Sequence, residues 1–336
     1  MFLFVTVLSL VASAAEPAAA DKKPDPPTVK VGGIVFAHYD YDLTDGADGY
    51  NEFALDRAYL TIQATLNPHL ATKLTLDGDR FKSTTLSDDS TVNVDTKYRV
   101  FVKHAYLEGR WDEPGLKVRG GIVDTPYCPF YDGFVGVRYI TESFAKQNKV
   151  LDTADLGVGV WGKQFDGLVD WNVSLLNGEG YGKPEVDKGK AVQGRVSIDP
   201  LAKGKKMNLP ITAFVSYNGQ PATEAPIVTM IGAVGFKQDY LVGWGEVLRV
   251  SNDEVVGEGY SATLVPRVPK FGGVLLRYDH FDRNADTEDD ASTTLIAGAT
   301  HDFFERVSLA GTFERTSKEG SDTPTQGVFV HMQAGF

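Results

Sequence analysis

Apolar and polar positions alternate with a period of two along almost the whole chain beyond residue 27. In the first such segment, residues 28–41, Val29 and Val31 share one face while Lys30 and His38 share the other. This period is typical of β-strands that have one apolar and one polar face. The segment is longer than most strands of soluble proteins, and strands of this length suit a membrane crossing.

About 16 segments follow this pattern, an even number of the kind that bacterial outer-membrane barrels use. The sequence thus predicts an all-β fold, an antiparallel transmembrane β-barrel that occupies residues 28–336. The predicted strands cover 28–41, 57–66, 70–77, 104–111, 116–122, 156–162, 167–177, 191–199, 210–218, 227–237, 240–250, 255–265, 271–282, 292–302, 306–315 and 325–336.

The connections between the predicted strands alternate in length. Short ones, as at 112–115 and 163–166, interleave with long ones, as at 78–95 and 124–155. An up-and-down barrel with short periplasmic turns and long outer loops produces this alternation, whereas a β-sandwich has no reason to show it. A longer inner turn at 200–208 is an exception.

The third outer loop, residues 124–155, is the longest stretch without clear alternation. Residues 141–150 within it are predicted to form a short helix capped by Thr141. A long insertion of this kind in a compact fold is normally functional.

The last predicted strand ends on an aromatic residue, Phe336. Val328, Val330 and Met332 share its apolar face, and His331 lies on the other face. The ending resembles the terminal strand of bacterial outer-membrane β-barrels, so Phe336 is expected to be the signal read by the barrel-assembly machinery. The alternative is a half-buried strand of a soluble β-protein.

The first 27 residues differ from the rest. Residues 1–15 are predicted to be a secretory signal peptide, because the apolar run 2–11 is too short to span a bilayer and small residues follow it. The usual Lys or Arg at its front is missing. Residues 16–27 are polar and Pro-rich, and we expect a disordered periplasmic lead-in. No later stretch approaches 18 apolar residues, the length expected of a transmembrane helix.

Charge and cysteine content narrow the functional classes. The formal net charge of −12 argues against a nucleic-acid partner. Cys128 is the only cysteine, which excludes disulfides within the chain and CxxC metal or redox sites.

Catalytic and cofactor motifs are missing or incomplete. The six histidines form no HExxH pair and no GxSxG is present, so neither a metalloprotease nor a serine hydrolase is predicted. A G-x-G-x-x-G match at 157–162 lies inside a continuing strand and opens no helix. Asp282, Asn284 and Asp286 have the spacing that begins a calcium loop, but the Gly and the final Glu are replaced. We therefore expect no enzyme, metal site or cofactor, and a loosely held divalent ion bridging to lipopolysaccharide is an open alternative.

Several short motifs resemble the phosphate-selective porin O and P family. In order they are YLE (106–108), GGIVDTPY (120–127), RYITESF (138–144), DLGVGV (155–160) and LLNG (175–178). The resemblance implies a homotrimeric porin of 16 strands whose third outer loop folds into the barrel and narrows it. This chain is shorter than typical members and lacks their dense run of loop arginines, so phosphate selectivity is not carried over with the fold.

A barrel of about 16 strands has a lumen too wide for wall side chains to fill, so it holds water unless a segment plugs it. The basic residues predicted to face this lumen are Lys30, Arg57, Lys73, Arg110, Lys117, Arg119, Arg195 and Arg277. The first six come from neighbouring strands and would form a basic strip on one wall. The charged residues of the predicted constriction loop are Asp132, Arg138, Glu142, Lys146 and Lys149.

Two interpretations of the basic strip stay open. It gives the pore a preference for anions, or it keeps the wall solvated and pairs with acids such as Asp77, Glu108 or Asp170. The first functional hypothesis is a porin in the bacterial outer membrane, in contact with lipid and lipopolysaccharide, through which small hydrophilic solutes or ions diffuse. Its alternatives are an adhesin or assembly scaffold whose lumen the third loop closes, and a soluble secreted β-protein that binds carbohydrate.

Overall fold

The computed structural model describes residues 26–80, 83–86, 92–95, 97–185, 188–204, 206–219 and 225–336. The predicted signal peptide, 1–15, and nearly all of the predicted lead-in, 16–27, lie outside these ranges.

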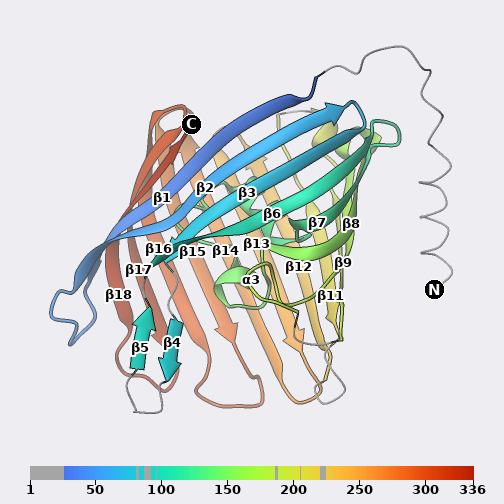
Figure 1. Ribbon diagram of the computed structural model, residues 1–336. Helices are drawn as coiled ribbons and strands as arrows, with labels where there is room; N and C mark the ends of the chain where they lie inside the picture. Colours follow the sequence, from blue (N-terminus) through green and yellow to red (C-terminus); the bar gives the residue numbers. More distant parts are fainter. Residues whose placement is uncertain are drawn as a thin grey trace, which may run out of the picture.

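The chain forms a closed antiparallel barrel of sixteen strands, which confirms the predicted fold class (Figure 1). Every strand pairs with its neighbours along the chain, and the first strand closes the barrel by pairing with the last. The barrel strands are β1 (Thr28–Asp42), β2 (Asn51–Asn67), β3 (Leu70–Arg80), β6 (Tyr98–Trp111), β7 (Leu116–Asp124), β8 (Ala154–Gln164), β9 (Val169–Leu176), β10 (Ala191–Ile198), β11 (Ile211–Asn218), β12 (Ile227–Gln238), β13 (Leu241–Ser251), β14 (Val256–Val268), β15 (Gly272–Asp282), β16 (Ser292–Phe304), β17 (Val307–Lys318) and β18 (Thr325–Gly335).

The seam between β1 and β18 includes the last residue. Tyr39 is paired with Val330 in its register, and the Phe336 amide donates to the carbonyl of Gly33 at 3.0 Å. The alternation on β18 is as the sequence predicts: Val330 is 48% exposed on the outer face, whereas the neighbouring His331 is 5% exposed on the inner face. On this strand the apolar face therefore points outward, and the mostly polar face points toward the lumen.

Two predicted strands start too late because a β-bulge interrupts the alternation. The pairing of β1 with β2 shifts by one residue at Asp56, and the pairing of β3 with β6 shifts at Lys103. A bulge inserts an unpaired residue and moves later side chains to the opposite face. The period of two therefore breaks there, although β2 begins at Asn51 and β6 at Tyr98.

The predicted outer loop 78–95 is not a plain loop. The strands β4 (Ser83–Leu86) and β5 (Val92–Asp95) pair within it as a separate two-stranded sheet. Figure 1 shows them at the lower left of the view, beside the lower ends of the barrel strands. Short 3₁₀ turns, η1 (Phe165–Gly167) and η2 (Ala202–Gly204), lie in two of the connections at the opposite end.

The third loop, residues 125–153, contains two helices, and we call it the constriction loop. Helix α2 (Cys128–Val135) was not predicted, since its aromatic residues have only modest helix propensity. Gly136, at φ 78°, ends it in the left-handed conformation that glycine favours. Helix α3 (Phe144–Gln147) is shorter than the predicted helix 141–150 and begins after Ser143, so the predicted cap at Thr141 was wrong.

None of the helices in the described part of the chain is long and apolar enough to cross a membrane.

Candidate pore constriction

The constriction loop is attached to the inner wall by a buried apolar cluster. Tyr127, Tyr131 and Phe144 have at most 1% of their surface exposed. Tyr131 meets Trp244 of β13 edge to face with ring centroids 5.7 Å apart, and Phe144 meets Phe281 of β15 in the same way at 5.9 Å. Buried aromatic pairs of this geometry stabilise packing beyond the area they bury. The loop is therefore held inside the barrel, as the resemblance implied, and Figure 1 shows α3 within the outline of the strands.

Arg277 of β15 fastens the loop by hydrogen bonds. Its guanidinium donates to the Glu142 carbonyl at 2.6 Å, the Gln147 side chain at 3.0 Å and the Thr141 hydroxyl at 3.1 Å, and it pairs with Asp279 at 2.8 Å. The side chain has no exposed surface. Arg277 faces inward as the sequence predicts, but it lies beneath the loop and does not line open lumen.

Arg195 of β10 has a similar position on the other side of the loop. Its Nε donates to the Pro126 carbonyl at 2.9 Å, its guanidinium lies 3.8 Å from the centre of the Phe130 ring, and it pairs with Asp170. Two of the predicted wall cations thus hold the loop in place.

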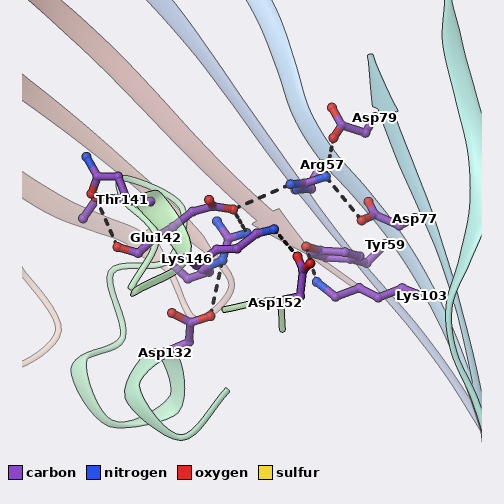
Figure 2. Close-up of polar contacts among 12 residues, drawn as sticks. Arg57, Tyr59, Asp77, Asp79, Lys103, Asp132, Thr141, Glu142, Lys146 and Asp152 are labelled. Atoms are coloured by element: carbon purple, nitrogen blue, oxygen red, sulfur yellow. Dashed lines mark hydrogen bonds and ion pairs between the residues drawn. The ribbon is translucent and has the colours of Figure 1, made fainter. Parts of the chain in front are cut away.

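The loop meets the opposite wall at Arg57 of β2. Figure 2 shows this guanidinium among three acids: it contacts Asp79, lies 3.5 Å from Asp77, and lies 3.6 Å from Glu142 of the loop. These side chains come from two strands and the loop, and the sequence placed Arg57 and Glu142 only in the same general region. Asp77 is fully buried, whereas Arg57, Asp79 and Glu142 keep partial exposure to the lumen.

On the loop itself, Arg138 lies between two acids. It donates to Glu142 at 2.7 Å and lies 3.4 Å from Asp132 of α2. Burial raises the pKa of Asp132 to about 6, although the charge of Arg138 acts in the other direction. One oxygen of this carboxylate is buried without a hydrogen-bond partner among the described residues. Asp132 therefore takes up a proton at a higher pH than an ordinary aspartate does.

Lys103 is a constriction residue that sequence reasoning missed. It is the bulge residue of β6, and its ammonium donates to the Tyr59 hydroxyl at 2.7 Å and lies 4.3 Å from the centre of that ring (Figure 2). The ring centre of Tyr181, from the loop after β9, lies 5.8 Å from the same ammonium. Under strict alternation Lys103 would point outward. The bulge that turns it inward is visible only in the pairing of β6 with β3.

The remaining loop cations differ in their surroundings. Lys146 pairs with Asp152 inside the loop, as Figure 2 shows. Lys149 is exposed and has a positive φ of 61° just after α3. Of the predicted loop residues, Asp132, Arg138 and Glu142 belong to one set of polar contacts, Lys146 forms a separate pair with Asp152, and Lys149 lies outside both.

The predicted basic strip exists on β3, β6 and β7, but acids accompany it. Arg119 donates to Glu108 at 2.6 Å and to Asp124 at 2.8 Å, and Arg110 donates to the same Glu108. Lys73 lies 5.9 Å from the Tyr106 ring centre in the same group. Lys30 and Lys117, the other two predicted wall cations, are exposed near the short-turn end of their strands.

The charges around the constriction balance. Seven of the cations in the contacts described above stand among seven acids: Arg57, Lys73, Lys103, Arg110, Arg119, Arg138 and Lys146 with Asp77, Asp79, Glu108, Asp124, Asp132, Glu142 and Asp152. Most of them are in direct contact with an opposite charge. The group keeps the lumen polar without a large net charge.

Nothing in the described ranges gathers three or more metal-ligating side chains. Cys128 is fully buried in α2, and this burial raises the pKa of its thiol, so the thiolate that reacts or binds metal is disfavoured.

Comparisons with known proteins support the fold. No family model and no curated protein matches the sequence. An anion-selective porin from Comamonas acidovorans superposes with a TM-score of 0.61 at 16% identity, over 92% of this chain and 100% of that one. OmpF of Salmonella typhi, solved in complex with daunomycin, gives 0.66 at 10% identity, over 94% and 99%. OmpT, an outer membrane protein of Vibrio cholerae, gives 0.61 at 12% identity, over 95% and 100%.

Identities this low show the fold alone. Membership in the phosphate-selective porin O and P family stays a prediction, since no comparison tests that finer assignment. The chain has the fold of bacterial outer-membrane porins, which agrees with the expected outer-membrane location.

Proposed function

We propose that this protein is a porin through which small hydrophilic solutes cross the outer membrane by diffusion, without a chemical step. The observation that carries the proposal is the constriction loop, which is anchored on β13 and β15 and reaches Arg57 on the opposite wall. A segment held across a wide lumen restricts what passes by size, and its partly exposed polar rim hydrates what does pass.

The pairing of charges favours weak ion selectivity at the constriction. A wall cation that already contacts an acid presents a much smaller field to a passing anion than an isolated one. An anion preference like that of the Comamonas porin would fit the excess of basic residues on β3, β6 and β7 of this chain. Here, however, Glu108 and Asp124 offset that excess. We therefore favour wall solvation over strong anion selection as the role of the strip.

Planar-bilayer recording of the purified chain tests the function. The wild type should give stepwise conductance, and deletion of residues 144–151 should enlarge each step because this segment narrows the lumen. Substitution of Arg249, whose pair with Glu258 lies on the outer face, should leave the step size unchanged. Migration on gels without boiling reports whether each variant has closed its barrel.

The adhesin or scaffold hypothesis predicts a different result. A silent wild type whose current appears only after the deletion would show that the loop closes the lumen, and it would replace diffusion with the scaffold role. No current from either protein, with both correctly folded, would exclude a channel.

Assembly is a further part of the proposal. We expect a homotrimer, as the resemblance implies; the OmpT neighbour was also solved in a trimer form. Phe336 is proposed as the signal for the barrel-assembly machinery, and its deletion should reduce the amount of folded barrel in cells. Mass measurement of the detergent-solubilised protein checks the trimer, and co-purifying lipopolysaccharide checks the predicted lipid partner.

A further inference from the structure

Opposite charges alternate in one continuous series from the barrel wall to the constriction loop. Asp79 of β3 contacts Arg57 of β2, which lies 3.6 Å from Glu142 of the loop (Figure 2). Glu142 in turn accepts a hydrogen bond from Arg138 at 2.7 Å, and Arg138 lies 3.4 Å from Asp132. Every charge in this set, which we call the charge series, thus has an opposite charge within the length of one ion pair.

All the side chains of the charge series keep part of their surface exposed. The exposed fraction is 34% for Asp79 and 28% for Glu142. It is 16% for Arg57, 19% for Arg138 and 17% for Asp132. A solute in the lumen can therefore reach both signs of charge at the constriction, and it reaches them side by side.

An ion and a dipolar solute respond differently to such a series. A single charge that approaches Arg57 also approaches Asp79 and Glu142, so attraction and repulsion largely cancel. A solute that carries an ammonium and a carboxylate a few atoms apart can place each group beside the opposite charge. Both contacts are then attractive, and both are charge-assisted hydrogen bonds.

We propose that zwitterionic solutes, of which the free amino acids are the simplest, are the class that this constriction passes most readily. The carboxylate of the solute lies beside Arg57 or Arg138, and its ammonium lies beside Asp79 or Glu142. The inference rests on the proposed function and deepens it, because it names the solute class of the same constriction. The balanced charges then select for opposite charges within one solute, and not for ions of one sign.

Two isomeric solutes separate the effect of charge from that of size. Alanine and lactamide have the same atomic composition and similar dimensions, but only alanine is a zwitterion at neutral pH. Swelling of liposomes that contain the full chain, corrected for liposomes without protein, measures the rate at which each solute enters. In low-salt buffer alanine should enter the wild-type liposomes about fivefold faster than lactamide.

The variant R57Q/E142Q removes one cation and one acid from the charge series and leaves the net charge unchanged. The ratio of the two rates should fall to about twofold or less, while the lactamide rate still reports the size of the opening. The matched control is R249Q/E258Q, which makes the same two changes in an ion pair on the outer face and should keep the wild-type ratio.

A second variant covers the case in which R57Q/E142Q does not close its barrel. K146Q/D152N removes the neighbouring ion pair of the loop, which is also partly exposed, and it should lower the ratio as well.

The outcomes separate this inference from the porin function. Equal rates for alanine and lactamide through the wild type would overturn the inference and leave the porin function standing. A wild-type ratio that R57Q/E142Q and K146Q/D152N both retain would also overturn it, since the preference would then arise elsewhere in the barrel. No entry of either solute through a folded barrel would refute the porin function itself.

Discussion

Arg57 of β2 and Glu142 of the constriction loop form an ion pair, with Nη2 and Oε1 3.6 Å apart. The guanidinium also contacts Asp77 and Asp79, and the carboxylate also accepts from Arg138. Barrel wall and loop therefore share one set of alternating charges, in which removal of either partner leaves the opposite charge in excess.

R57Q and E142Q should consequently shift ion selectivity in opposite directions. R57Q leaves its acids in excess and should favour cations, while E142Q frees Arg57 and Arg138 and should favour anions. A unit charge about 4 Å from a passing ion changes its energy by about 1 kcal/mol in water, or about fivefold in permeability ratio, and salt reduces this. Reversal potentials in a low-salt gradient measure this change in the permeability ratio.

The control for this pair is R249Q, which removes a charge from the outer face. It should not move the reversal potential, because the barrel wall lies between that charge and the lumen. A shift of the same sign in R57Q and E142Q would contradict the shared network.

Lowering the pH should make the channel more favourable to anions. Burial raises the pKa of Asp132 to about 6, so this carboxyl takes up a proton between pH 7.5 and 5 and Arg138 loses one of its acids. The reversal potential should move toward anions over this window. D132N is already neutral at this position, so its reversal potential should move less between the two pH values than that of the wild type.

The same shift has a consequence for stability. The pKa of Asp132 is higher in the folded chain than its ordinary value of 3.8, so the folded state binds the proton more tightly. Its contribution to folding is therefore most favourable at low pH and is lost as the pH rises through about 6. Denaturant unfolding of wild type and D132N at pH 5 and 7.5 should show a smaller difference between the two proteins at pH 5.

The alternation of side chains was sufficient to predict the barrel. A lipid-facing strand needs apolar residues on one face only, so the pattern records where each uninterrupted strand runs. It failed where pairing shifts, at Asp56 and Lys103, because a bulge depends on the neighbouring strand and has no local signature. Lys103 was missed as a constriction residue for this reason.

The site was predictable only in part. Arg57 and Glu142 could be assigned to wall and loop, but their contact depends on the path of the loop. That path is set by aromatic residues such as Tyr131 and Phe144, which follow no period and pack against strands far away in the sequence. Arg277 faces the lumen in the alternation, and only the folded loop reveals that it is covered.

R277Q should loosen the constriction loop. The substitution removes donors to Glu142, Gln147 and Thr141 and leaves Asp279, which is 6% exposed, without its cation. Breaking a buried pair in this way costs about 3–5 kcal/mol. We expect noisier single-channel current and faster tryptic cleavage in the loop.

R249Q again provides the comparison, because exposed pairs like that of Arg249 and Glu258 contribute about 1 kcal/mol or less. It should match the wild type in noise and in cleavage. Equal noise and cleavage in R277Q and wild type would show that the apolar cluster and the remaining polar contacts hold the loop without Arg277.

A single methyl group at Gly259 should displace the constriction loop from its position on the inner wall. A Cβ there would lie 2.5 Å from the His280 carbonyl oxygen and 2.8 Å from Phe144 of α3, closer than such atoms approach in proteins. Gly232 of β12 faces the other way, and its Cβ would meet only Val247 at the ordinary distance of 3.6 Å. G259A should therefore lower the free energy of unfolding by about 1–3 kcal/mol, the usual cost of overpacking, and G232A should not.

The same pair of variants links packing to conduction. If the inner wall around Gly259 positions the constriction, G259A should change the single-channel step while G232A leaves it at the wild-type value. Both variants carry the same added methyl group. Any difference between them is therefore due to the face of the barrel on which the methyl group lies, and not to the chemistry of the substitution. Equal steps in all three proteins, with G259A destabilised as expected, would mean that the other contacts of the loop, among them those of Arg57, Arg195 and Arg277, keep it in position.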